Sequence, residues 1–89
     1  MLERELTVTN RLGLHARATA RLVQVLSGFR SNATLLAKGR EVNAKSIMGV
    51  MLLAAGQGTP VTVRVEGPDE AEALAAVVEL FERQFDEGQ

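Results

Sequence analysis

The sequence predicts an α+β fold of two layers, in which helices cover one face of a small β-sheet. Residues 60–66 alternate between apolar and polar side chains, which is the pattern of a half-buried strand. Residues 16–27 and 69–85 instead repeat apolar side chains at helical spacing. Clusters of Gly and Pro separate such segments along the chain. Short strands interspersed with helices typically pack as a two-layer sandwich.

The N-terminal third is expected to form a strand, a loop and a helix. Apolar side chains alternate with polar ones over residues 2–9, which predicts a half-buried strand. Arg4 interrupts the apolar series, so we expect the start of this strand to be frayed. Residues 10–14 form a loop. Apolar spacing then predicts a helix from Ala16 to about Ser27, with Gly28 as its C-terminal stop.

The middle of the chain is expected to form a hairpin and a short helix. Residues 32–37 and 40–43 are strand candidates, and Lys38-Gly39 is a tight turn between them. Residues 46–55 follow as a short helix, with Ser46 as a candidate N-cap. Gly56-Gln-Gly58 ends that helix.

The C-terminal third is expected to add a strand and a longer helix. The strand covers residues 60–66, and Gly67-Pro68 breaks the chain after it. Asp69 and Glu72 resemble a capping box, and the helix runs from there to about Phe85. We expect one apolar stripe on this helix: Ala71, Leu74, Val77, Val78, Phe81 and Phe85. The order β-α-β-β-α-β-α predicts one domain over residues 1–89, with an antiparallel or mixed sheet.

The composition excludes several functions. A formal net charge of −1 argues against nucleic-acid binding driven by phosphate attraction. The chain has no cysteine and one histidine, so we expect no disulfide, no metal site and no cofactor. No apolar run approaches the length of about 20 residues that spans a membrane, so we expect a cytoplasmic protein without membrane insertion.

His15, the only histidine, precedes the first predicted helix in the segment Gly13-Leu-His-Ala-Arg17. The orphan amides and the dipole of a helix N-terminus favour an anion and a neutral imidazole. The amides of Ala16, Arg17 and Ala18 are therefore candidate phosphate ligands, and the guanidinium of Arg17 adds a fork suited to phosphate. We interpret His15 as a phosphoryl acceptor, with Gly13 permitting the backbone angle that aims its ring. The alternative is an incidental surface histidine.

The predicted second helix carries two further candidates. Ser46 is either a plain N-cap or a phosphorylation site, because a phosphate is tolerated at a helix N-terminus. The helix is too short to bury every face, so its apolar side chains are either core or an adaptable docking patch. These side chains are Ile47, Met48, Met51 and Leu52.

Two motifs and the order of elements together resemble the histidine-containing phosphocarrier (HPr) family of the bacterial phosphoenolpyruvate-dependent sugar phosphotransferase system. The motifs are Gly-Leu-His15-Ala-Arg17 and the run Val42-Asn-Ala-Lys-Ser46-Ile-Met-Gly-Val-Met51. The resemblance covers essentially the whole chain. It implies an open-faced β-sandwich, with a four-stranded antiparallel sheet and three helices on one face.

The resemblance also implies roles for particular residues. His15 would accept a phosphoryl group on Nδ1 from phospho-enzyme I and pass it to enzyme IIA domains, while Arg17 steadies the group. The apolar side chains around Ile47, Met48 and Met51 would dock both partners. In relatives from Gram-positive bacteria, an ATP-dependent kinase phosphorylates the serine that matches Ser46, and a phosphorylase is its counterpart. The carrier is expected to act as a monomer. The family usually has proline where this chain has Ala18, and often threonine where it has Ala20.

Other functions remain open at this point. The nearest is the same carrier in a regulatory, nitrogen-type phosphotransferase branch, although the Lys-Ser46-Ile-Met-Gly run favours the sugar type. A small non-catalytic α+β interaction module, with His15 incidental, is a second alternative. An enzyme with turnover of its own is disfavoured, because no paired carboxylates, nucleophile–base set or metal cluster is evident in the sequence.

Overall fold

The computed structural model describes residues 1–86 and has the predicted order of helices and strands. A short 3₁₀ turn, η1 (Gln84–Asp86), follows the last helix. The other elements are β1 (Leu2–Thr7), α1 (Ala16–Ser27), β2 (Asn32–Ala37), β3 (Arg40–Asn43), α2 (Ile47–Leu52), β4 (Pro60–Glu66) and α3 (Glu70–Glu82).

The four strands form one antiparallel sheet in the order β1-β4-β2-β3, so the alternative of a mixed sheet is excluded. β4 lies in the interior of the sheet and pairs on both sides, with Val63 opposite Arg4 of β1 and Leu35 of β2. The turn between β2 and β3 has positive φ at Lys38 and Gly39, 53° and 75°, as a two-residue hairpin turn requires. The predicted hairpin is therefore confirmed.

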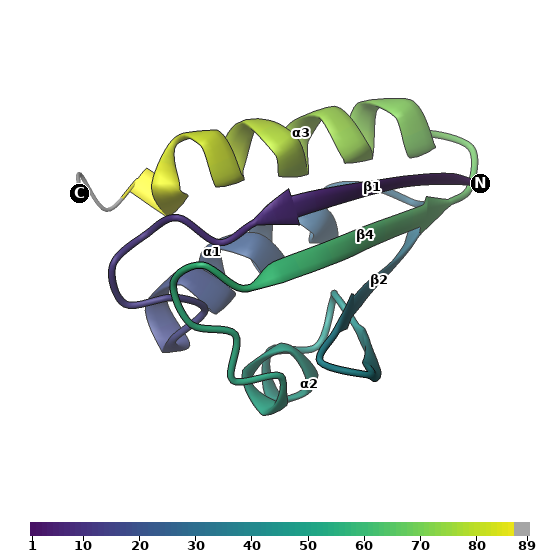
Figure 1. Cartoon of the computed structure of the whole chain (residues 1–89). Helices are drawn as coiled ribbons and strands as arrows, with labels where there is room; N and C mark the ends of the chain where they lie inside the picture. The colour runs from purple at the N-terminus through teal and green to yellow at the C-terminus, as the bar shows by residue number, and fades with distance from the viewer. Residues whose placement is uncertain (87–89) are drawn as a thin grey trace.

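The hydrophobic core lies between one face of the sheet and the helices. Alternate side chains of β4 and β2 are fully or almost fully buried, while those between them, such as Thr62 and Thr34, are only half-buried. α1 and α3 pack against each other, and α3 also packs along β1 and β4, whereas α2 contacts α1 and β3 (Figure 1). The fold is the predicted open-faced sandwich of a four-stranded antiparallel sheet and three helices.

The first strand differs from the prediction at both ends. Its regular pairing starts at Leu2, opposite Val65, so the expected fraying at Arg4 was wrong. The N-terminal ammonium group also lies 3.1 Å from the carboxylate of Glu70, which helps to hold this end. The strand ends at Thr7, before the buried Val8, and most of it is exposed because β1 is an edge strand.

Two helices are shorter than predicted. α2 ends at Leu52 rather than Ala55, because Ala54 adopts a left-handed conformation with φ of 49°. α3 ends at Glu82 rather than Phe85, because residues 84–86 all have positive φ. This left-handed turn places Phe85 in the core, with its ring centroid 4.9 Å from that of Phe81.

The predicted capping box of α3 was also wrong. Asp69 occupies the N-cap position but makes no side-chain capping bond. Its carboxylate instead accepts hydrogen bonds from the amides of Arg30 and Ser31 and from the Ser31 hydroxyl. The carboxylate of Glu70 accepts from the amide of Gly67. The buried side of α3 also differs from the predicted apolar stripe. The buried residues are Ala73, Val77, Leu80 and Phe81, whereas Ala71, which was predicted to lie on the stripe, is exposed.

Candidate functional site

His15 occupies the N-cap of α1. Its backbone is extended, with φ of −76° and ψ of −177°, and its carbonyl accepts the first helical hydrogen bond from the amide of Thr19. The ring is half-buried, and Nδ1 accepts a hydrogen bond of 3.3 Å from the amide of Arg17. A ring nitrogen that accepts must carry a lone pair, so the neutral imidazole holds its proton on Nε2. Nδ1 and its lone pair therefore face the first turn of the helix.

The turn before His15 depends on Gly13. Its φ is 68°, which confirms the unusual backbone angle expected at this glycine. A Cβ atom at this position would lie 2.6 Å from the carbonyl oxygen of Ala55 and 2.7 Å from Cα of Gly56. The next residue, Leu14, donates from its amide to that same Ala55 carbonyl at 2.8 Å. The loop between α2 and β4 therefore supports the backbone that leads into His15.

The predicted phosphate ligands on α1 differ in exposure. Ala16 and Arg17 are exposed, whereas Ala18 is fully buried, which favours the first two amides as ligands of an anion outside the helix. All three amides precede the first i→i−4 bond, so none has a partner within the helix backbone. Within residues 1–86, the guanidinium of Arg17 forms no ion pair. The side chain of Arg17 is exposed, two residues after His15.

Ser46 caps the N-terminus of α2, as predicted. Its backbone is extended, and its hydroxyl oxygen accepts a hydrogen bond of 3.0 Å from the amide of Gly49. Gly49 leaves little space here, since a Cβ atom would lie 3.3 Å from the Ser46 Oγ. The hydroxyl is only half-buried. A group attached to it would lie at the positive end of a short helix.

The apolar side chains of α2 form an exposed patch rather than core. Met48 is 72% exposed and Leu52 is 63% exposed, with Ile47 at 45% and Met51 at 41%. In α2 itself only Val50 is buried. Leu12, on the loop before His15, is 67% exposed and was not identified from the sequence. We call these five residues the apolar patch: Leu12, Ile47, Met48, Met51 and Leu52.

The apolar patch adjoins the imidazole. A shallow surface hollow of about 280 Å³ brings the ring together with side chains of the His15 loop and with α2 and the segment that follows it. Its lining comprises Leu12, Leu14, His15, Met51, Ala54, Ala55 and Gly56. The structure thus places His15 and one end of the patch on the same face.

Basic side chains border the C-terminal end of α2. The ammonium group of Lys38 donates to the carbonyl of Ala54 at 2.7 Å, and the guanidinium of Arg40 donates to that of Leu52 at 3.2 Å. These cations bind the last carbonyl of α2 and one in the segment just after it, and they compensate the negative end of the helix dipole. They also place positive charge beside the exposed Met51 and Leu52.

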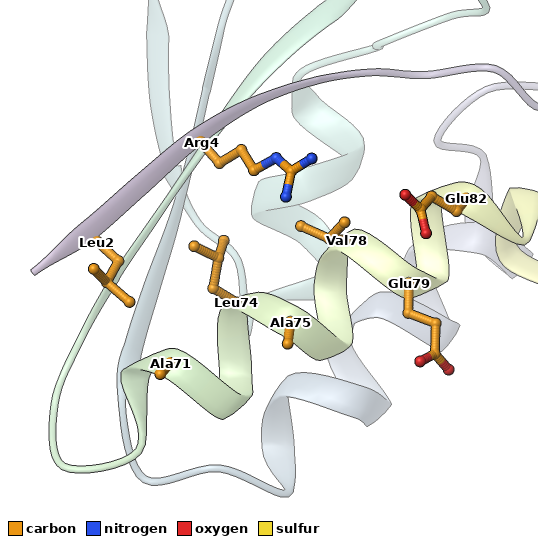
Figure 2. A pocket seen from close by; sticks show the side chains of 8 residues that line it. All are labelled: Leu2, Arg4, Ala71, Leu74, Ala75, Val78, Glu79 and Glu82. Carbon is orange, nitrogen blue, oxygen red and sulfur yellow. The ribbon is translucent and has the colours of Figure 1, made fainter.

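A second and larger hollow, of about 400 Å³, lies between β1 and α3 and shares no lining residue with the first. Figure 2 shows Arg4 extending from β1 towards Val78, with Glu79 and Glu82 further along the helix. Arg4 is on the same strand face as Leu2 and Leu6, which explains why it interrupts the apolar pattern in the sequence. This hollow is separate from the one beside His15, so it adds nothing to the chemistry of that residue.

The resolved shifts in carboxyl pKa lie outside the residues of the His15 site. The Ser31 hydroxyl, followed by the Arg30 amide, holds the pKa of Asp69 below its ordinary value. The amide of Gly67 does the same for Glu70. Among the residues described, no group of three or more potential metal ligands occurs. None of the helices described is long and apolar enough to cross a membrane.

Comparisons with known proteins agree with this geometry. Residues 2–83 match a family model described as the phosphorylation site of the HPr component of the phosphotransferase system. The chain is 70% identical over 87 residues to the phosphocarrier protein HPr of Xylella fastidiosa strain Temecula1, covering 98% of each. It is 52% identical over 89 residues to that of Cupriavidus necator, covering 100% of each. A crystal structure of HPr from Thermoanaerobacter tengcongensis superposes with a TM-score of 0.94 at 45% identity, covering 98% of both chains.

Proposed function

The chain belongs to the HPr family of phosphocarrier proteins of the phosphotransferase system, and from that premise we propose that His15 carries the phosphoryl group. The donor is phospho-enzyme I, and the acceptors are enzyme IIA domains of sugar permeases. One observation supports this most strongly. The Nδ1 lone pair of His15 already faces the amide of Arg17, where the first turn of α1 can receive negative charge.

The transfer step follows from this geometry. The Nδ1 lone pair attacks phosphorus, and the bond between phosphorus and the donor's leaving atom breaks, with its electron pair going to that atom. The proton on Nε2 stays on the ring. The amide of Arg17 loses its nitrogen acceptor and donates to a phosphoryl oxygen instead, together with the amide of Ala16. The guanidinium of Arg17 adds a second, charged donor.

The site suits a carrier better than an enzyme. A carrier must hold the phosphoryl group loosely enough to pass it onward, and an exposed helix N-terminus provides few ligands. The hollow beside His15 is shallow and open to solvent. Because the described lining of this hollow contains no acidic or basic side chain other than His15, proton transfers in each step depend on the partner's own residues. We therefore expect stoichiometric phosphorylation without turnover.

The apolar patch is the proposed docking surface for both partners. Its methionine side chains can adapt to more than one partner surface, because they are unbranched and polarizable. Lys38 and Arg40 border the patch, so a partner with acidic residues around an apolar centre fits it best. Because the donor and the acceptor would use the same surface, enzyme I and an enzyme IIA domain cannot bind the carrier at the same time. We expect the carrier to be monomeric, and the chain to form one domain over residues 1–89 that acts in the cytoplasm.

Ser46 is the proposed regulatory position. A phosphate there would lie at the N-terminus of α2, next to Ile47 and Met48 of the patch. The helix tolerates this charge, whereas an acidic partner docked on the patch is repelled by it. The phosphate therefore opposes docking without unfolding the protein. Its source would be an ATP-dependent serine kinase.

Incubation with phosphoenolpyruvate and enzyme I, followed by intact mass measurement, tests the proposed function. We expect one added phosphoryl group that is labile in acid and stable in base, and none on His15→Ala. Acid-labile phosphate that persists on His15→Ala would contradict the assignment. A protein that never takes up phosphate would favour a simple interaction module. Transfer to enzyme IIA domains of sugar permeases, compared with those of nitrogen-type branches, then distinguishes the two carrier roles.

A further inference from the structure

We propose that Asn10 is a positioning residue for His15, an inference that rests on the proposed function. Asn10 is fully buried although its side chain is polar, and it begins the loop that ends at His15. Burial of an amide side chain costs free energy unless the side chain is hydrogen-bonded. We therefore expect the hydrogen bonds of Asn10 to fix the conformation of this loop.

The carboxamide of Asn10 holds the loop in a closed turn. Nδ2 donates to the carbonyl of Gly13 at 2.7 Å, and the backbone amide of Gly13 donates back to the carbonyl of Asn10 at 3.1 Å. These two bonds enclose Arg11 and Leu12, so the side chain closes the turn from inside the protein. Because the turn is closed, Leu12 projects outward into the apolar patch.

The same turn determines where the chain enters α1. It sets the positive φ of Gly13, at which the backbone touches Ala55 and Gly56. Leu14 then has both of its backbone groups bonded, its amide to the carbonyl of Ala55 and its carbonyl to the buried hydroxyl of Thr19 at 3.1 Å. The residue that follows is His15. Its ring can meet the amide of Arg17 only if this entry path is kept.

The loss of the Asn10 side chain should therefore act on His15 through the backbone. Without the bond to its carbonyl, Gly13 can leave the left-handed conformation that the turn imposes. The ring of His15 then samples orientations in which Nδ1 no longer faces the helix N-terminus. Docking on the patch residues of α2 is kept, because α2 has its own cap at Ser46. The main expected effect is on the rate within the complex, with a smaller effect on its formation through Leu12, which the same turn holds in the apolar patch.

The test compares Asn10→Ala with Ser31→Ala. Ser31 is also buried and polar, but its hydroxyl bonds to Asp69 at the start of α3, so it is a control for general loss of stability. If Asn10→Ala does not fold, the second variant is Asn10→Ser, which removes less side-chain volume and keeps a hydroxyl group as a hydrogen-bond donor. The measurements are NMR spectra of the His15 ring nitrogens and the Arg17 amide, and rates of transfer from phospho-enzyme I. A lost hydrogen bond should shift the Nδ1 and Arg17 signals and speed exchange of that amide with solvent.

We expect these NMR changes in the Asn10 variants and not in Ser31→Ala. We also expect a loss of roughly tenfold in the maximal transfer rate, the effect of a misplaced reacting group, with a smaller rise in KM from the displaced Leu12. Spectra of His15 and Arg17 that match those of Ser31→Ala would overturn the proposal, as would shifted spectra with an unchanged maximal rate. If the unsubstituted protein takes no phosphate, the proposed function fails, but the NMR comparison still judges the role of Asn10.

Discussion

Ala54 offers a sharp test of how the segment beside His15 is built, because it adopts a left-handed conformation that disfavours alanine. Its φ is 49°, and its side chain is exposed, so Ala54→Gly removes strain without removing core packing. A left-handed residue other than glycine costs about 1–2 kcal/mol. Glycine adds about 0.4–1 kcal/mol of entropy to the unfolded chain, which opposes the gain. The difference predicts a net stabilisation of about 0.5–1 kcal/mol.

Thermal and urea denaturation measure this difference. For a domain of this size the stabilisation corresponds to a rise in Tm of roughly 2–8 °C. Ala75→Gly is the matched control, because Ala75 is also exposed but lies inside α3 with helical backbone. There the same chemical change should destabilise by about 1 kcal/mol. If both variants lose stability to the same extent, the left-handed conformation of Ala54, and with it the argument for the end of α2, is refuted.

Three further predictions concern docking, regulation and acid stability. Met48→Asp should weaken binding of enzyme I strongly with little change in Tm, because Met48 is 72% exposed. Calorimetric titration measures the affinity and thermal melts measure Tm. An unchanged affinity would exclude Met48 from the interface. Ser46→Asp should slow phosphorylation of His15 while keeping the helix cap. Ser46→Ala should keep the phosphorylation rate but lose about 1 kcal/mol of stability. Equal phosphorylation rates for Ser46→Asp and the unsubstituted protein would leave Ser46 with the role of a cap alone. The folded protein lowers the pKa of Asp69, so the stability that its carboxylate contributes is present above the unfolded pKa and is lost as pH falls through the folded one. Asp69→Asn should therefore be less stable at neutral pH and lose less on acidification, and urea melts across acidic pH that run parallel for both proteins would contradict this.

Local patterns predicted the parts of the fold in which local and tertiary preferences agree. The alternation over residues 60–66 requires one buried and one more polar face, and β4 has both. The helical patterns placed His15 directly before the first helix and made Ser46 a candidate cap of the second, and both residues cap their helices in the structure. The resemblance further predicted the antiparallel sheet, which the strand patterns alone left open.

Contacts between distant segments decided what local patterns missed. The sequence around Asp69 resembles the start of a capping box. Its carboxylate instead accepts hydrogen bonds from the amides of Arg30 and Ser31, which lie 39 and 38 positions earlier in the chain. α2 ends at Leu52 because Ala54 adopts a left-handed conformation, and no glycine at that position signals this in the sequence. Leu12 belongs to the apolar patch only because the turn closed by Asn10 turns it outward. None of these contacts leaves a periodic trace in the sequence.

The site of phosphoryl attachment on His15 tests the central claim most directly. The measurement is NMR of protein labelled with ¹⁵N and phosphorylated by enzyme I, in which coupling to phosphorus identifies the bonded ring nitrogen. The hydrogen bond from the Arg17 amide to Nδ1 predicts that phosphorus is bound to Nδ1, with the Arg17 and Ala16 amide signals shifted by the new phosphoryl acceptor. Phosphorus on Nε2, or on any residue other than His15, would contradict the account.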